Sequence, residues 1–455
     1  MPRAKGARAT TMPVIHAHAA GLDVGATFHV VAVSPDCADQ PVRTFRSFTE
    51  DLQRLADWLQ VVGVTTIAME STGVYWIPVF EILEAHGFEV LLVNARDVKT
   101  VPGRKTDVND AQWLQQLHQF GLLRGSFRPS DAMVRVRAFV RHRETLVSAA
   151  GTQIQRMQKA LMQMNVQLHH VVTDITGVTG LRILRDIVAG IHDPARLALH
   201  RDGRCKQTPE TIRQALVGNY RPEHLFALRQ TLELYDVLQA KIAETDAAIA
   251  AALTTLPLPE AASAAPLPAV RHTKGKNEPH FDVRRALFAL IGADLSQIHG
   301  LGPYTVLRMV TECGTDMTKW PTVKHFTSWL TLCPGNKISG GRVLSAKTRR
   351  SSNRVAALLR IAAVNVGRMQ TALGAFYRRL AARIGKAKAV TATARKLAVL
   401  FYNAVRHGLQ YVDPGVDHYE ARYKQRVIEN LERRARQLGL QVIRPASLPQ
   451  TTGVS

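Results

Sequence analysis

The first part of the chain, from residue 19 to about 125, alternates short apolar runs with amphipathic ones. The run GLDVGATFHVVAVS predicts a strand, a turn and a second strand, and VRTFRSF predicts a third. Two buried strands, VTTIAMEST and FEVLLVNA, alternate with predicted helices at residues 50–59, 76–87 and 107–120. Opening strands followed by strand–helix alternation predict an α/β layer with a mixed sheet.

From residue 131 the apolar residues follow a heptad. They recur every seven residues from Val140 to Leu168, with one polar break at Arg143, and a second run repeats the pattern from Leu228 to Ile249. Two long heptad helices predict an antiparallel coiled-coil arm. An ordinary helical bundle within one domain is the alternative.

These changes of pattern divide the chain into six predicted segments. They are a disordered tail (1–18), the α/β domain (19–130), the coiled-coil region (131–253), a Pro- and Ala-rich linker (254–283), an α-helical domain (284–412) and a basic C-terminal helix with its tail (413–455). The sequence predicts no role for the insert at 190–220 or for the C-terminal tail.

The distribution of charge along the chain predicts a binding partner. The 455 residues carry a formal net charge of +23, and 46% of them are hydrophobic, enough for two or three packed domains. Between Asp316 and Asp413 there is no acidic residue, whereas 18 Lys or Arg fall in that interval. A surface that serves solubility alone mixes both signs, so this distribution predicts binding to nucleic acid.

Cysteine usage and hydropathy exclude other classes. The 4 Cys form no CxxC pair, so a disulfide framework or a zinc knuckle is not expected and a reducing cytoplasm is the predicted location. The basic N-terminus lacks the apolar core of a secretory signal, and no stretch is long and apolar enough to span a membrane.

Four carboxylates stand where a metal site is plausible. Asp23 follows an apolar run, Glu70 ends a buried strand, and Asp107 and Asp110 lie three apart at the start of a helix, on one face. Taken singly, Asp23 and Asp107 are better explained by a turn and a helix cap. Together they could hold Mg²⁺ or Mn²⁺ for phosphoryl transfer. This order of acids is typical of a ribonuclease-H-like fold, as in Holliday-junction resolvases of the RuvC type.

Longer motifs carry a family resemblance. GLDVG, AMESTGVYW, VNARDVK and GRKTDVNDAQWLQQL, followed by IHGLGPYTVLRMVTECG, FTSWLTLCPGNKISGG and TATARKLAVLFYNAVRHG, resemble the DEDD transposases of the IS-one-ten group of insertion sequences. The resemblance covers about residues 19–425. It implies a RuvC-like DEDD domain, a coiled-coil region and a C-terminal transposase domain, and it assigns the four acids to Mg²⁺.

The resemblance also implies a nucleophile and partners. By motif match Ser339, just before a Gly pair in KISGG, is the serine that forms a covalent phosphoserine with DNA. The implied partners are donor and target DNA, a structured guide called a bridge RNA, and further copies of the chain in a dimer or tetramer.

Residues around Ser339 suit this role. Gly340 and Gly341 allow a phosphate to approach the backbone, and Lys337 and Arg342 could neutralise it. On the sequence alone a flexible turn is the favoured interpretation of SGG, and the family resemblance reverses that preference. Ser345, Ser351 and Ser352 are the fallback candidates.

Other positions are predicted to bind the DNA backbone. HGLGPYT resembles the turn of a helix-hairpin-helix, with Gly300 and Gly302, although a plain helical hairpin is the alternative. The cations that follow are suited to phosphate contacts: Arg349, Arg350, Arg354, Arg360 and Arg368. Tyr75 and Trp76 could stack on a base, but a place in the core is the favoured interpretation.

The sequence therefore predicts a transposase that cleaves and exchanges DNA strands. Two other classes stay open. A hydrolytic junction resolvase would use the four acids with water and form no protein–DNA adduct. A non-catalytic scaffold would bind nucleic acid equally well with and without Mg²⁺. Clustered carboxylates count against this class, because they would repel the nucleic acid.

Overall fold

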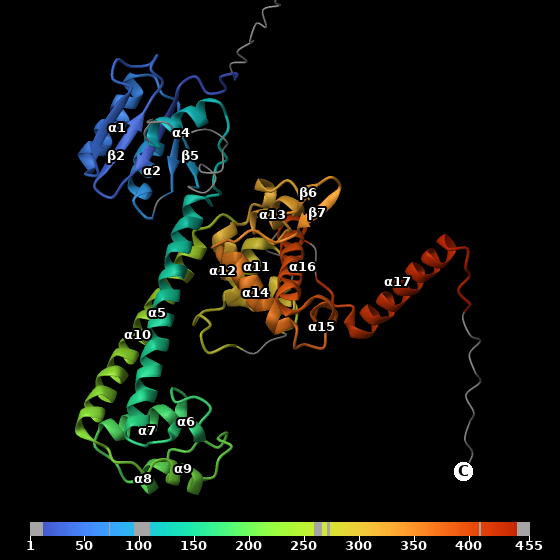
Figure 1. Ribbon diagram of the computed structural model, residues 1–455. Coiled ribbons are helices and arrows are strands. Elements are labelled where there is room, and N and C mark those ends of the chain that lie inside the picture. The colour runs from blue at the N-terminus through green and yellow to red at the C-terminus, as the bar shows by residue number, and fades with distance from the viewer. Residues whose placement is uncertain are drawn as a thin grey trace, which may run out of the picture. The chain divides into compact units, whose positions relative to one another are not determined.

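A computed structural model describes residues 12–71, 73–94, 110–258, 266–270, 274–408 and 411–443 of the chain (Figure 1). These form two compact units, Met1–Arg128 and Pro129–Ser455, here called the first and second units. Asp107, residues 259–265 and 271–273 of the predicted linker, and the ends of both predicted tails lie outside the described residues. No helix in the described part of the chain is long and apolar enough to cross a membrane.

The first unit holds a mixed five-stranded sheet in the order β3-β2-β1-β4-β5. Strands β1 to β3 pair antiparallel, whereas β1, β4 and β5 run parallel. This topology confirms the mixed sheet predicted from the sequence and fits a ribonuclease-H-like domain. The strands are β1 Ala19–Val24, β2 Phe28–Ala32, β3 Val42–Arg46, β4 Thr66–Glu70 and β5 Glu89–Val93.

Helices cover both faces of this sheet. Alternate residues of β1 and β4, among them Leu22 and Met69, point into a core shared with α1 (Thr49–Val61) and α2 (Trp76–Ala85). The opposite face is covered by α4 (Asp110–Gln119), whose Leu114 and Leu117 pack on Val93 of β5. Both faces are therefore buried, as the apolar composition of the parallel strands requires.

Two long helices, α5 (Asp131–Gln163) and α10 (Pro222–Thr254), dominate one part of the second unit. They pack side by side (Figure 1), and since Arg143 near the start of α5 contacts Asp246 near the end of α10, they run antiparallel. Their buried positions follow the predicted heptads, including Val140, Met157, Leu161 and, on α10, Leu228, Tyr235 and Ile249. Short helices cap one end of the pair: α6 Leu168–Val171, α7 Val178–Val188, α8 Pro194–Ala198 and α9 Pro209–Ala215.

The polar break in the first heptad, Arg143, is fully buried. Its guanidinium bonds the Asp246 carboxylate and donates to the Asn277 carbonyl at 2.9 Å, and it lies 4.7 Å from the centre of the Tyr304 ring. The backbone amide of His280 donates to the same Asp246 at 3.0 Å. Hydrogen bonds thus join the C-terminal part of the predicted linker, at Asn277 and His280, to α5 and α10.

The rest of the second unit is a helical assembly that carries one small hairpin. Its elements are α11 Val283–Ile291, the 3-10 helices η1 Leu295–Gln297 and η2 Met317–Lys319, α12 Pro303–Cys313, α13 Val323–Trp329, strands β6 Lys337–Ser339 and β7 Arg342–Ser345, α14 Arg354–Val366, α15 Ala372–Ile384, α16 Lys386–His407 and α17 Gly415–Gln437. Buried Phe326 and Phe401 join α13 to α16, whereas α17 buries no residue.

Candidate active site

Asp23 and Glu70 lie on the same face and at the same end of the sheet. The parallel pairing of β1 with β4 places Gly21 opposite Ala68, so Asp23 and Glu70, each two residues further on, project to the side on which Gly21 and Ala68 lie. Both carboxylates are half-buried. Strand alternation therefore delivers the first two predicted acids to one edge of the sheet.

Helix α4 brings Asp110 to that edge. The backbone of α4 lies directly on Gly21, where an added Cβ would fall 2.2 Å from the Ala111 carbonyl oxygen. At the other end of α4, His118 shares a 2.8 Å hydrogen bond with Thr66, the first residue of β4. The helix thus runs opposite to β1 and β4, and its first residue, the exposed Asp110, lies toward the strand ends that carry the other two acids.

The two residues that hold α4 against the sheet, Gly21 and His118, were not predicted from the sequence. Gly21 stands two residues before Asp23, on the same face of the strand, and that spacing was the available signal. His118 is buried, and its ring stacks on His16 with centroids 4.8 Å apart. Burial, and then the neighbouring His16, lowers the pKa of His118 to about 4, so the imidazole is neutral at physiological pH. The amides of Ile15 and His16 also donate to the Gln119 carbonyl that ends α4.

Carboxylate oxygens are the ligands that Mg²⁺ and Mn²⁺ prefer. The donor chemistry at this edge therefore suits a hard divalent cation. Within the described residues, however, no three acidic, His or Cys side chains come close enough to hold a metal ion. The fourth predicted ligand, Asp107, lies outside those residues.

Ser339 lies in an exposed hairpin of the second unit. It ends β6 and pairs directly with Arg342 of β7, and the turn between them is Gly340–Gly341, with φ of 53° and 74°. Two successive residues at positive φ require a turn that glycine adopts without strain. Because paired residues share a face of a hairpin, Arg342 lies beside Ser339. Lys337, two residues earlier in β6, pairs with Ser345 beyond a shift in the register of the two strands.

The fallback serines differ from Ser339 in their contacts. The Ser351 hydroxyl accepts the Asn353 amide at 3.0 Å, just before α14, and the Ser345 hydroxyl accepts the Lys347 amide at 3.4 Å. Both support local turns. Ser339 instead lies exposed at the end of its strand, directly opposite Arg342.

The predicted hairpin around Gly300 joins the 3-10 helix η1 to α12. Gly300 has φ of 90°, and a Cβ there would fall 2.4 Å from Cγ2 of Val366 on α14, so close packing explains this glycine. Gly302 precedes α12 and makes no side-chain capping bond, which is normal for glycine. The structure therefore gives Gly300 a packing role, whereas phosphate binding at the two glycines stays a prediction.

Several of the predicted phosphate-binding arginines are already engaged. Arg354 donates to Glu144 at 2.7 Å and lies 3.7 Å from Glu312, both of which also bond other arginines of the second unit. Arg349 makes a long 3.5 Å contact with the Ser328 carbonyl. Arg354 therefore has less charge to offer DNA than the exposed Arg342.

The two aromatic residues that follow Glu70, Tyr75 and Trp76, differ in burial. Trp76 is half-buried and meets Phe80 edge-on, with centroids 5.7 Å apart, so its predicted place in the core is confirmed. Tyr75 is 47% exposed, so the same prediction for Tyr75 is wrong. It lies in the turn before α2.

The sheet order and the carboxylates on one edge place the first unit among ribonuclease-H-like domains. Two family models match the chain, one described as a transposase over residues 20–166 and one described as the transposase IS116/IS110/IS902 family over residues 292–378. Together they cover about half of the chain, in the predicted order. The chain belongs to the IS110 family of DEDD transposases, the IS-one-ten group, and is an enzyme that acts on DNA. No curated protein matches it.

Proposed function

We propose that this transposase cleaves and exchanges DNA strands with two sets of groups, the acids Asp23, Glu70, Asp107 and Asp110, and the serine Ser339. The observation that carries the proposal is the placement of Asp23, Glu70 and Asp110 toward one edge of one sheet by β1, β4 and α4. Acids collected in this way next to a polyanionic substrate repel it unless a cation lies between them.

The four acids would hold Mg²⁺ or Mn²⁺. Such ions offset the charge of a phosphate and stabilise an attacking and a leaving oxygen. The protein's own contribution is to fix the ligands: Gly21 seats α4 on β1, and the Thr66–His118 bond ties the far end of α4 to β4. Both contacts set where Asp110 lies relative to Asp23.

Ser339 is the proposed nucleophile. Its Oγ forms a bond to a DNA phosphorus, the bond from that phosphorus to one deoxyribose oxygen breaks, the serine proton leaves to a base, and the released oxygen takes up a proton. The phosphoserine ester conserves the bond energy, so attack by another strand's hydroxyl reverses the step and joins new ends. Arg342, which pairs with Ser339, and Lys337 of the same hairpin neutralise the phosphate.

The remaining parts of the second unit would hold nucleic acid and further copies of the chain. The antiparallel pair α5–α10 is the proposed coiled-coil arm, and dimer or tetramer assembly is proposed with it. The acid-free segment, with Arg349, Arg350 and Arg354 and the turn at Gly300 and Gly302, would contact the phosphate backbone. A bridge RNA would then choose the target, since backbone contacts carry no base sequence.

An adduct assay tests the nucleophile and the acids together. The full chain would be mixed with RNA transcribed from its element, labelled donor and target DNA and Mg²⁺, and resolved on a denaturing gel. A labelled protein–DNA band is expected for the unaltered protein and for Ser345→Ala, the matched control on the opposite strand of the hairpin. The band should be absent from Ser339→Ala and Glu70→Ala.

The opposite pattern would change the assignment. If DNA is cut without any adduct, and Ser339→Ala still cuts it, the enzyme uses water and is a hydrolytic nuclease. If the chain binds DNA equally with and without Mg²⁺ and Glu70→Ala cuts as well as the unaltered protein, the acids are not catalytic. Omission of the RNA separates guided from unguided cleavage in the same gel.

A further inference from the structure

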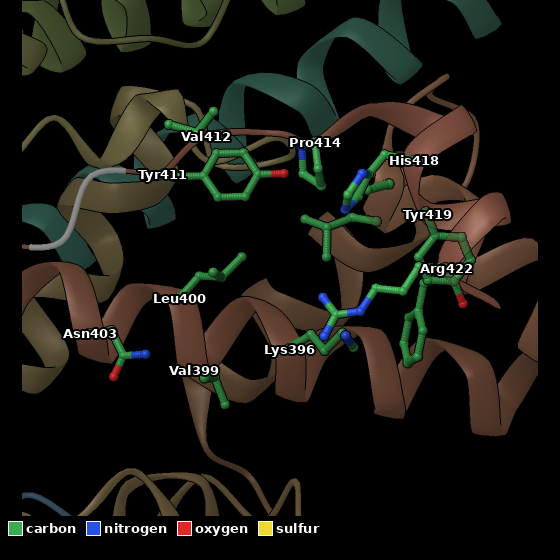
Figure 2. A pocket seen from close by; sticks show the side chains of 13 residues that line it. Lys396, Val399, Leu400, Asn403, Tyr411, Val412, Pro414, His418, Tyr419 and Arg422 are labelled. Atoms are coloured by element: carbon green, nitrogen blue, oxygen red, sulfur yellow. The ribbon is translucent and has the colours of Figure 1, made fainter. Parts of the chain in front are cut away.

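A pocket of about 720 Å³ lies between α15, α16 and the start of α17 (Figure 2). Its walls are mostly apolar, with Leu373 and Phe376 from α15 and Val399 and Leu400 from α16. Most of the lining residues lie beyond residue 378, where the second family model ends. Its volume is in the range of pockets that enclose a small organic ligand.

Cations gather at one side of this pocket. Figure 2 shows Arg422 reaching from α17 into the pocket toward Lys396, and the Lys396 ammonium lies 4.4 Å from the centre of the Phe376 ring. Burial lowers the pKa of Lys396, and so do the charges of Arg426 and Arg422. Among the residues that the structure describes, no carboxylate lines the pocket. Like charges collected without an acid cost energy, which a bound anion offsets.

Aromatic rings stand beside these cations. Phe376 and Tyr419 meet edge to face, with centroids 6.4 Å apart, and both line the pocket. Glu420 of α17 is bonded to Arg379 of α15 and does not line the pocket. The combination is a flat apolar wall with a positive edge.

We infer that this pocket binds one unpaired nucleotide of the DNA substrate, with the base against Phe376 and Leu400 and its phosphate at Lys396 and Arg422. A base supplies a flat apolar face and its phosphate supplies the anion, so one ligand satisfies both parts of the pocket. The inference rests on DNA as the substrate of this family and not on the role of Ser339. Strand exchange unpairs nucleotides, which supplies the ligand.

The test compares two DNA duplexes that differ by one extra, unpaired thymidine in the middle of one strand. Dissociation constants for both would be measured with the full chain by fluorescence anisotropy, without Mg²⁺, so that no cleavage occurs. The unaltered protein should bind the bulged duplex roughly tenfold more tightly than the paired one, as expected for one stacked base. Leu400→Trp, which fills the pocket and keeps every charge, should bring the ratio of the two constants close to one.

Arg422→Gln should also reduce this ratio, whereas Arg434→Gln, the same charge change on the same helix outside the pocket, should leave it unchanged. Unchanged thermal unfolding of each variant would exclude misfolding as the cause. A ratio near one in the unaltered protein, or a tenfold ratio that survives Leu400→Trp, would overturn the inference. A preference for bulged RNA with none for bulged DNA would overturn the assignment to DNA. Because no cleavage is measured, failure of the serine mechanism would leave this result intact.

Discussion

At Gly21 the absence of a side chain lets α4 lie directly on β1. A Cβ at this position would fall 2.2 Å from one backbone atom of α4 and 2.3 Å from another, and backbone cannot turn aside as a flexible side chain can. Since α4 begins with Asp110, this one residue controls the separation between two of the proposed metal ligands. A small change in volume therefore affects both packing and chemistry.

Gly21→Ala should lower the free energy of unfolding by about 1–3 kcal/mol, the usual cost of overpacking, and should reduce adduct formation more than the lost stability explains. Urea unfolding and the adduct gel, run at a temperature where the variant is folded, measure the two effects. Gly151→Ala on α5 is the control. A Cβ there meets nothing within 4 Å, and Ala favours a helix by up to about 1 kcal/mol over Gly, so that variant should be slightly stabilised.

The buried His118 makes the first unit sensitive to acid. Its pKa is lowered to about 4 in the folded protein, against an ordinary value of 6.5, so between these values the unfolded chain binds the extra proton more readily. Stability is complete above about pH 6.5 and falls as the pH drops toward 4, by about 2 kcal/mol at pH 5. Urea unfolding at pH 7.5 and pH 5 should show this loss.

His118→Gln should flatten that dependence, because Gln can still bond Thr66 but does not titrate. The exposed His142→Gln should keep the full pH dependence. If His118→Gln loses as much stability between the two pH values as the unaltered protein, the acid sensitivity arises elsewhere.

At the scale of whole elements, the α5–α10 pair contains a buried ion pair in a mostly apolar seam. Arg143 and Asp246 are both buried, and the segment around Asn277 and His280 is bonded to them. Removing one partner leaves the other charge buried without compensation. Arg143→Met should therefore cost about 3–5 kcal/mol of unfolding free energy, and the double variant Arg143→Met/Asp246→Leu should recover most of it.

Calorimetry of the full chain would measure this in the second unit's transition. The matched control is Arg185→Met, which removes an exposed pair with Asp236 at 3.2 Å and should cost less than about 1 kcal/mol. If the double variant were as unstable as the single one, packing and not charge would account for the loss.

Periodicity predicted the elements well, because it records which face of each element is buried. The mixed sheet and the buried heptad positions such as Val140 and Leu228 followed from it. The contacts between elements that lie far apart in the sequence could not be predicted from periodicity. Arg143 was seen only as a break in the heptad, since its partner Asp246 is 103 residues away and no local pattern connects them. The exposure of Tyr75 likewise depends on where its turn lies and not on its neighbours in sequence.

The predicted site shows the same division. Asp23 and Glu70 could be recognised because they lie near the C-terminal ends of apolar strands, and strand pairing then places them on one face. Arg354 was assigned to DNA from the charge of its segment, but Glu144, 210 residues earlier, bonds it in the fold. Charge composition identifies a partner for the segment as a whole, and tertiary contacts decide which cations remain available to it.

At the scale of the whole molecule, the excess of positive charge predicts DNA binding that weakens steeply with salt. Each phosphate contact contributes about 0.9 to the slope of the logarithm of the binding constant against the logarithm of salt concentration. Arg342→Gln should therefore reduce the slope by about 0.9 if this exposed residue contacts a phosphate. Anisotropy titrations at several salt concentrations measure it.

Arg213→Gln is the control for that titration, because Glu210 already bonds Arg213 at 2.7 Å and neutralises its charge. Its slope should match that of the unaltered protein. If Arg342→Gln also leaves the slope unchanged, the hairpin that carries Ser339 does not contact the DNA backbone in the complex.

The helix pair has a further consequence, which concerns length. Each of its helices has 33 residues, and at 1.5 Å per residue such a helix spans about 50 Å. That distance equals the rise of about 15 base pairs of DNA. Nucleic acid held at both ends of the pair would therefore be spaced by a fixed interval, and removing one heptad from each helix would shorten that interval by about three base pairs.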